Sequence, residues 1–204
     1  MESVVILAGG KSTRMGRNKA LLDFGGETLI ERVFRILQEA FEQVIISAND
    51  TRAYEFLGAH VVRDVFADAG SLAGIHAGLL HARGQHCFIV ACDMPFVNVE
   101  LVRYLHGFTT DFDVVIPQSR YSEPSRTGLE PLHSFYSRNC IPHIEEQLRS
   151  NNLRIIDFFD QVNVRRVTID EVRACDPEEL SYFNINTPEK YELAKKKLLR
   201  QRGK

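Results

Sequence analysis

The sequence predicts one α/β domain, residues 1–204, built around a mostly parallel β-sheet. Three observations lead to this prediction. Short apolar runs alternate with segments in which apolar residues recur at helical spacing, and this alternation is typical of βαβ units. The length of 204 residues matches a single domain. The chain also contains no internal repeat and no low-complexity linker that would divide it.

The composition excludes several classes of protein. The 44% apolar and 25% charged residues are those of an ordinary globular protein. A net charge of −2 argues against a surface built to hold nucleic acid. No apolar run approaches the roughly 20 residues of a membrane helix, and no basic region precedes the first apolar run, as a signal peptide requires. The four cysteines are widely spaced, so we expect reduced thiols in a cytoplasmic protein. The net charge and the lack of a long apolar run lead us to expect no nucleic-acid or membrane partner.

The first half of the chain predicts four strands and two helices. Residues 4–8 form a continuous apolar, β-branched run, as expected of a strand buried on both faces. Thr28 and Glu31 have the spacing of a capping box, and apolar residues repeat at helical spacing behind them as far as Phe41. The other predicted elements of this half are strands at 43–47, 60–63 and 87–91 and a helix at 71–83.

The second half continues the alternation with shorter elements. Its predicted elements are strands at 112–116, 132–136 and 162–169 and helices at 99–106, 137–148, 153–159 and 171–174. Pro142 falls inside one of these helices and predicts a kink there. Pro188 suits the first turn of a closing helix, because that position needs no N–H donor.

The loop after the first strand, Leu7 to Lys19, is the first candidate binding segment. Ligands of such sheets bind beyond the carboxyl ends of the strands. The three glycines of this loop let backbone N–H groups close around phosphate oxygens, and Arg14 and Lys19 add positive charge. The Gly10-Lys11-Ser12 run suggests a Walker A P-loop, but that motif needs a glycine where Val5 stands, so this interpretation fails.

Two further motifs carry polar groups at the ends of apolar runs. In Val90-Ala91-Cys92-Asp93-Met94-Pro95 a carboxylate follows a buried strand, where it can bind a Mg²⁺ ion that bridges nucleotide phosphates. In Phe183-Asn184-Ile185-Asn186-Thr187-Pro188 two asparagines alternate on a predicted short strand, and their amides can orient a phosphate. Each motif alone also fits an ordinary turn or helix cap. Their shared position at strand ends favours one common site.

Together these motifs resemble the molybdenum cofactor guanylyltransferase family, a branch of the nucleotidyltransferases. The resemblance rests on Leu7-Ala8-Gly9-Gly10 with Arg14-Met15-Gly16 and Lys19, then Cys92-Asp93-Met94-Pro95, then Asn184-Ile185-Asn186-Thr187-Pro188. It runs in order through essentially the whole chain. It implies a Rossmann-like, three-layer sandwich of the nucleotide-diphospho-sugar transferase type. Asn18 departs from the pattern, because many relatives carry Asp there.

The resemblance also implies roles for individual residues. It assigns nucleotide binding to Leu7, Ala8, Gly9, Gly10, Lys19, Asn49, Asp64, Gly74 and Asp93. It assigns catalysis to Arg14, Lys19 and Asp93, with Asp93 as the Mg²⁺ ligand. The implied reaction is attack by the terminal phosphate of molybdopterin, with or without molybdenum, on the α-phosphorus of GTP. Cofactor-insertion proteins or apo-molybdoenzymes are the implied protein partners.

The stretch 118–130 is expected to serve the acceptor. It is polar apart from Tyr121 and Leu129, so too little can be buried to order it and we expect a mobile loop. It follows a predicted strand, and Arg120 and Arg126 suit an anionic acceptor. Asn184 and Asn186 are the other candidate acceptor-binding residues.

Three alternative functions stay open on the sequence. A sibling enzyme transfers CMP to the same cofactor, but such proteins tend to read Thr-Ala-Ala-Gly where this chain reads Leu7-Ala8-Gly9-Gly10. A sugar-1-phosphate or isoprenoid nucleotidyltransferase shares the N-terminal loop. A catalytically silent nucleotide- or cofactor-binding module is the third alternative, and the presence of Asp93 and Lys19 argues against it.

Overall fold

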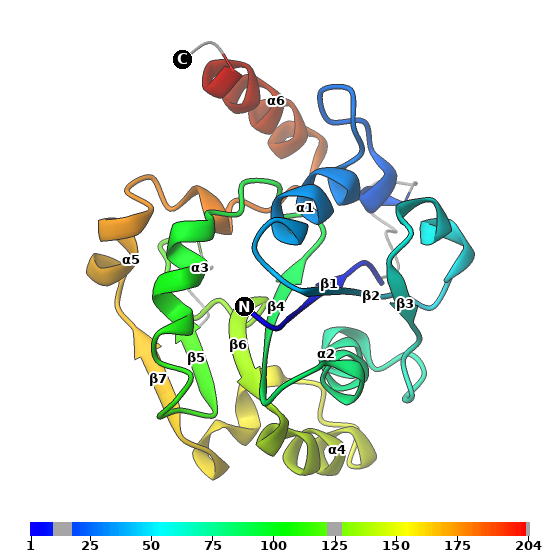
Figure 1. The fold of residues 1–204 in the computed structure, drawn as a ribbon, viewed down its shortest axis with the longest axis vertical. Coiled ribbons are helices and arrows are strands. Elements are labelled where there is room, and N and C mark those ends of the chain that lie inside the picture. The colour runs from blue at the N-terminus through cyan, green and yellow to red at the C-terminus, as the bar shows by residue number, and fades with distance from the viewer. Residues whose placement is uncertain (10–17, 122–127, 203–204) are drawn as a thin grey trace.

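Seven strands form one sheet in the part of the chain that the structure, a computed structural model, describes: residues 1–9, 18–121 and 128–202 (Figure 1). The strands are β1 Ser3–Leu7, β2 Gln43–Ser47, β3 His60–Val62, β4 His86–Ala91, β5 Val114–Pro117, β6 His133–Ser137 and β7 Val164–Val167. Their order is β3-β2-β1-β4-β6-β5-β7. Only β6, among these strands, runs antiparallel to its neighbours. The predicted mostly parallel α/β sheet is confirmed.

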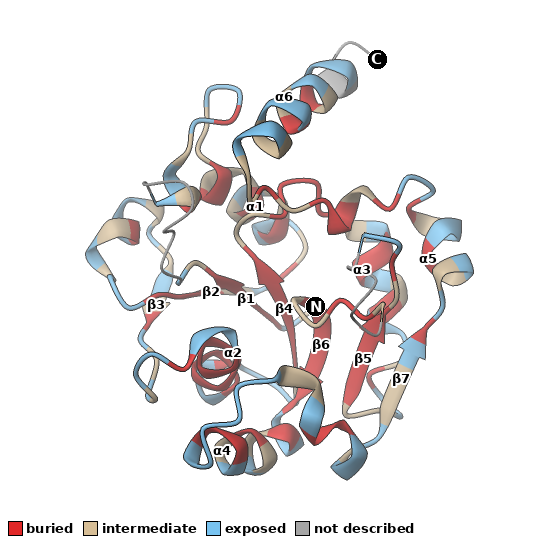
Figure 2. Ribbon diagram, turned by 180° about the vertical axis from the view of Figure 1, so that it is seen from behind, coloured by how far each residue is buried: buried red, intermediate tan, exposed pale blue. Residues whose placement is uncertain are grey.

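Helices cover both faces of the sheet and produce three layers (Figures 1 and 2). They are α1 Leu29–Gln38, α2 Gly70–His81, α3 Val99–His106, α4 Ile141–Arg149, α5 Ile169–Cys175 and α6 Pro188–Arg202. Side chains of β1 alternate between the layers: Val4 lies in the buried cluster that contains residues of α1, α3 and α5, and Val5 lies in the cluster that contains residues of α2 and α4. This alternation follows from the two-residue period of a strand. It explains why β1 is buried along its whole length and reads as a continuous apolar run.

Helix α2 lies close to β1 because two glycines face the sheet. A Cβ atom added at Gly78 would lie 2.4 Å from Cγ2 of Val5, and one added at Gly74 would lie 2.9 Å from Cδ2 of Leu7. Both distances are too short for carbon atoms in contact. The close approach brings the beginning of α2 to the carboxyl ends of β1 and β2.

Two predicted helices differ in the structure. The segment 137–148 begins with a 3₁₀ turn, η3 Arg138–Cys140, and Pro142 lies in the first turn of α4. The predicted kink at Pro142 is therefore wrong, because a proline in the first turn removes no helical hydrogen bond. The segment predicted as a helix at 153–159 is a 3₁₀ helix, η4 Ile155–Gln161.

Two predicted strands also differ. The strand expected at 162–169 ends at Val167, because Thr168 and Glu171 form a capping box that begins α5. The short strand expected around Asn184 is absent from the described structure, and that segment is an irregular connection to α6.

The described ends of the stretch 118–130 are ordered, so the predicted mobile loop is wrong there. Gln118 and Leu129 form an antiparallel bridge, and the hydroxyl of Ser119 donates to Oε1 of Glu130 at 2.5 Å. Ser119, Leu129 and Glu130 are buried. The polar groups are ordered because they satisfy one another, which the count of apolar residues does not reveal.

Two further findings concern the cysteines and the helices. All four cysteines carry free thiols. Among the helices that the structure describes, none combines the length and the apolar character needed to cross a membrane.

Candidate active site

A pocket of about 180 Å³ opens at the carboxyl ends of β1 and β4. Its walls come from the segments on both sides of residues 10–17, from the beginning of α2 and from the residues around the end of β4. The lining residues are Leu7, Ala8, Gly9, Asn18, Lys19, Ala20, Ser71, Ala91, Cys92, Asp93 and Leu132. Two of the three motifs predicted to share a site at the strand ends therefore line one cavity, and the third, around Asn184, does not line it.

Asp93 and Lys19 form an ion pair in the wall of this pocket. Nζ of Lys19, in the 3₁₀ helix η1 Lys19–Leu21, donates to Oδ2 of Asp93 at 3.5 Å. Burial raises the pKa of Asp93, and the adjacent ammonium of Lys19 opposes this rise. Both side chains keep about a fifth of their surface exposed, 23% for Lys19 and 21% for Asp93. A carboxylate and an ammonium are thus accessible to a ligand in the pocket.

The turn that carries Asp93 is held by two distant segments. Nε of Arg32, in α1, donates to the carbonyl of Pro95 at 2.8 Å. The backbone N–H of Ile185 donates to the carbonyl of Asp93 at 2.8 Å. The second bond explains why the segment around Ile185 forms no strand: it docks on the turn beside the sheet instead of pairing within it.

Asn49, Asp64 and Gly74 form a second cluster that adjoins the pocket. Nδ2 of Asn49 donates to Oδ2 of Asp64 at 3.2 Å, and the hydroxyl of Ser47 donates to Oδ1 at 3.2 Å. Burial raises the pKa of Asp64, and these two hydrogen bonds oppose the rise. Gly74 lies beneath the carboxylate and against Leu7, which lines the pocket. Gly74 thus has a packing role, because it lets α2 approach Ser47 and Leu7.

The remaining predicted site residues have varied positions. Gly10, Arg14 and Arg126 lie outside the described residues. Arg120 is anchored, because its Nε pairs with Oε1 of Glu179 at 3.3 Å and its backbone N–H donates to Oε2 at 2.9 Å.

The two asparagines near the beginning of α6 differ in their surroundings. Oδ1 of Asn184 accepts a hydrogen bond from Nζ of Lys190 at 3.3 Å. Oδ1 of Asn186 is buried and has no hydrogen-bond partner within the described residues. Neither asparagine is among the residues that line the pocket, although Ile185 between them is bonded to Asp93.

Tyr54, which sequence analysis did not identify, joins the two walls of the pocket. Tyr54 is 1% exposed, and its hydroxyl donates to the carbonyl of Ala8 at 3.0 Å. The same hydroxyl accepts from Nδ2 of Asn18 at 3.0 Å. Ala8 follows β1 and Asn18 caps η1, so one hydroxyl connects both ends of the segment 9–17. Tyr54 lies in the 3₁₀ helix η2 Arg52–Leu57, far from the glycine-rich loop, and no sequence signal predicts this contact.

The residues of the pocket fit a magnesium ion that is bound together with a nucleotide. Among the described residues, no group of three or more His, Cys, Asp or Glu could hold a metal ion by itself. Mg²⁺ in nucleotide sites is bound by one or two carboxylates together with phosphate oxygens and water, so it needs no such group. Asp93 supplies one accessible carboxylate at the pocket, with Lys19 beside it.

Comparisons with known proteins give a consistent result. The family profile described as MobA-like NTP transferase domain matches residues 4–165. A probable molybdenum cofactor guanylyltransferase of Pelotomaculum thermopropionicum is 45% identical over 184 residues, which cover 90% of this chain and 87% of that protein. A molybdenum cofactor guanylyltransferase of Desulfosudis oleivorans is 38% identical over 192 residues, 93% of this chain and 92% of that protein.

A solved structure gives the same indication. Molybdopterin-guanine dinucleotide biosynthesis protein A from Archaeoglobus fulgidus superposes with a TM-score of 0.83 at 30% sequence identity. The match covers 98% of this chain and 100% of that one. The predicted resemblance and the predicted fold are therefore both confirmed.

Proposed function

The chain belongs to the MobA-like NTP transferase family, and from this premise we propose that it transfers GMP from GTP to the terminal phosphate of molybdopterin. The products are the guanine dinucleotide cofactor and pyrophosphate. The protein is thus a nucleotidyltransferase, a molybdenum cofactor guanylyltransferase like its curated relatives. The observation that carries the proposal is the accessible pair of Asp93 and Lys19 in a pocket at the carboxyl ends of β1 and β4.

Nucleotide binding is assigned to the segments that surround this pocket. Leu7, Ala8 and Gly9 form one wall of the pocket. We propose that Gly10 and Arg14 also contact the nucleotide. The cluster of Asn49 and Asp64 adjoins the pocket and offers an amide and a carboxylate that suit the hydroxyl and N–H donors of a ribose and a base.

The chemistry needs positioning and charge neutralisation more than proton transfer. The attacking phosphate oxygen is already negatively charged, so no general base is required. Asp93 would hold Mg²⁺, which when bound neutralises charge on the nucleotide phosphates. Lys19 lies within 3.5 Å of Asp93 and is available to the departing pyrophosphate, together with Arg14.

The acceptor side is proposed from the segments next to Asp93. Asn184 and Asn186 flank the residue that is bonded to the Asp93 carbonyl. Arg120 and Arg126 stay candidates for the anionic acceptor, with Arg120 anchored on Glu179. We also propose a cytoplasmic location, and cofactor-insertion proteins or apo-molybdoenzymes as recipients of the product.

A comparison of nucleotides tests the function directly. The protein is incubated with molybdopterin, Mg²⁺ and one of ATP, GTP, CTP or UTP, and pyrophosphate is measured. We expect GTP to be used at least about tenfold better than CTP, a difference of about 1.4 kcal/mol. Equal use of the two nucleotides, or a preference for CTP, would support the CMP-transferring sibling. Transfer to a sugar phosphate but not to molybdopterin would support the sugar-1-phosphate alternative.

The variant Tyr54→Phe tests whether the hydroxyl of Tyr54 positions the nucleotide. Tyr54→Phe keeps the buried ring but removes the hydroxyl that joins Ala8 to Asn18. We expect the KM for GTP to rise by about three- to tenfold with kcat changed less, because binding must then reorder both walls.

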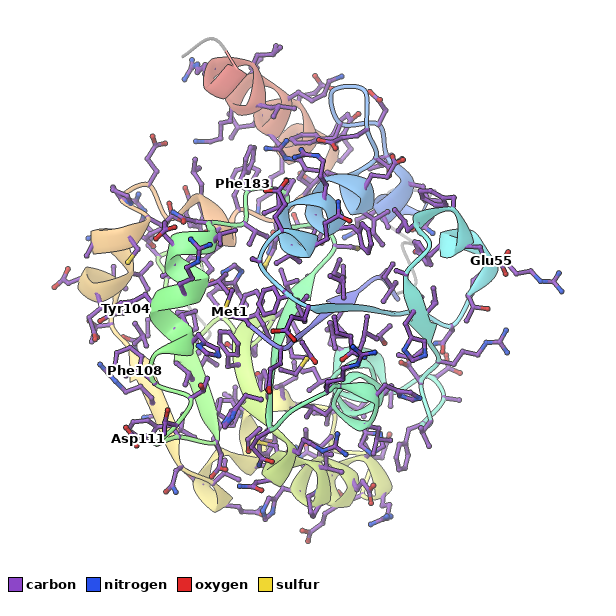
Figure 3. All side chains as sticks on the ribbon, viewed as in Figure 1. Met1, Glu55, Tyr104, Phe108, Asp111 and Phe183 are labelled. Carbon is purple, nitrogen blue, oxygen red and sulfur yellow. The ribbon has the colours of Figure 1, made fainter. Side chains whose placement is uncertain are left out.

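The matched control is Tyr104→Phe, since the hydroxyl of Tyr104 donates to Glu171, away from the pocket (Tyr104 is labelled in Figure 3). The same KM for GTP in both variants would refute the role of Tyr54.

A further inference from the structure

A second lysine, Lys190, is connected to Asp93 from the far end of the chain. Lys190 lies in the first turns of α6, and its Nζ donates to Oδ1 of Asn184 at 3.3 Å. Ile185, the residue after Asn184, donates its backbone N–H to the carbonyl of Asp93 at 2.8 Å. The Lys190 ammonium is therefore fixed to the segment that docks on the Asp93 turn.

The beginning of α6 is held in place by packing. Ala194 and Leu198 lie in a buried cluster with Phe24, Phe96 and Phe183 (Phe183 is labelled in Figure 3). The backbone N–H of Lys190 donates to the hydroxyl of Thr187 at 3.3 Å. The half-buried Lys190 side chain thus extends from a fixed helix end and not from a free tail.

The two lysines come from different parts of the site. Lys19 belongs to the N-terminal segment that lines the pocket, which is the nucleotide side of the proposed function. Lys190 belongs to the segment that holds Asn184 and Asn186, and Oδ1 of Asn186 is buried without a hydrogen-bond partner within the described residues. A buried acceptor without a donor is costly unless a ligand or water satisfies it. The cation of Lys190 suits a phosphate, whereas the Asn186 oxygen needs an N–H or O–H donor, which the pterin ring carries.

We propose that Lys190, held by Asn184, binds the terminal phosphate of the pterin phosphate monoester that accepts GMP. The inference rests on the proposed function. An oxygen of this phosphate forms a bond to the α-phosphorus of GTP, while the bond from that phosphorus to the bridging oxygen breaks and pyrophosphate leaves with the electron pair. Two anionic phosphates must approach each other in this step. An ammonium on the acceptor side reduces their repulsion without transferring a proton.

Two variants separate the positive charge of Lys190 from its hydrogen bond to Asn184. Lys190→Gln keeps an N–H donor for Asn184 and removes the charge, whereas Lys190→Arg keeps the charge. Lys196→Gln is the matched control, because Lys196 is an exposed lysine on the same helix. Dissociation constants for molybdopterin and for GTP are measured separately for each folded protein, followed by the KM of each substrate in the transfer reaction.

We expect Lys190→Gln to weaken molybdopterin binding and raise its KM by about tenfold or more, with the GTP values within about twofold of the unaltered protein. Lys190→Arg should recover most of the molybdopterin binding that Lys190→Gln loses, and Lys196→Gln should stay near the unaltered values. The inference is overturned if Lys190→Gln leaves molybdopterin binding unchanged, or if it weakens GTP binding equally. If the unaltered protein binds molybdopterin without transferring GMP, the proposed function fails and the binding comparison still decides the role of Lys190. If it does not bind molybdopterin, both fail.

Discussion

Replacement of Asp93 by alanine is expected to lower the rate of GMP transfer by about 10²-fold or more, as is usual when a group that stabilises transition-state charge is removed. The carboxylate lies at the pocket wall, 3.5 Å from Nζ of Lys19, and it is the proposed anchor for Mg²⁺. Because Asp93 is fixed through its backbone carbonyl by Ile185, the turn itself does not depend on the side chain. The melting temperature should therefore change little.

The measurement is pyrophosphate release under saturating substrates, with circular dichroism to verify folding. Asp50→Ala is the matched control, since Asp50 is an exposed carboxylate in the segment that follows β2. A titration with Mg²⁺ adds a second readout: the concentration for half-maximal rate should rise in Asp93→Asn, which keeps the size of the side chain. A folded Asp93→Ala protein with nearly full activity would exclude Asp93 as the metal ligand.

Lowering the pH from about 7.5 to about 5 is expected to remove about 2 kcal/mol from the free energy of unfolding through His133 alone. His133 is fully buried at the beginning of β6, and neither ring nitrogen has a hydrogen-bond partner within the described residues. Its ring packs edge-on against Phe88 and Tyr182, with centroids 4.9 and 5.1 Å apart. Burial without a partner lowers the pKa of His133 to about 3.

The direction of this effect follows from the two pKa values. In the unfolded chain a histidine titrates near about 6.5, so acid protonates the unfolded state before the folded one. The contribution of His133 is complete above about pH 6.5 and is lost progressively as the pH falls toward the folded pKa of about 3.

Urea unfolding of His133→Leu at both pH values isolates this contribution. Leucine has a similar volume and no proton to bind, so the difference in pH dependence between the two proteins cancels the other titrating groups. His60→Leu serves as the control, because His60 is exposed. If the unaltered protein and His133→Leu lose the same stability on acidification, His133 does not titrate as its burial implies.

His133 also shows the limit of what a sequence says about a histidine. In the sequence it is one of seven and has no metal-like spacing. Its energetic role comes from Phe88 on β4 and from Tyr182 in the 3₁₀ helix η5 Leu180–Tyr182, which approach it only in the folded protein. The same holds for Tyr54 and Ile185, whose hydrogen-bond partners Ala8 and Asp93 lie far away along the chain.

The sequence alone determined most of the strands and helices and the edge of the sheet at which the site lies. Continuous apolar runs such as 4–8 specify buried parallel strands, because both faces of the strand must be apolar, and every predicted strand except the one around Asn184 begins within two residues of an observed strand. Loop residues beyond those strands necessarily meet at one edge, so Lys19 and Asp93 could be placed together in advance.

The tertiary structure alone decided how the site is held and charged. The sequence could not show that Tyr54 joins Ala8 to Asn18, that Ile185 docks on Asp93, or that Arg120 is anchored on Glu179. These contacts link residues that are distant in the chain, so no periodicity records them. Periodicity reports only which face of an element is buried, whereas a hydrogen bond or an ion pair depends on the position of two side chains in space.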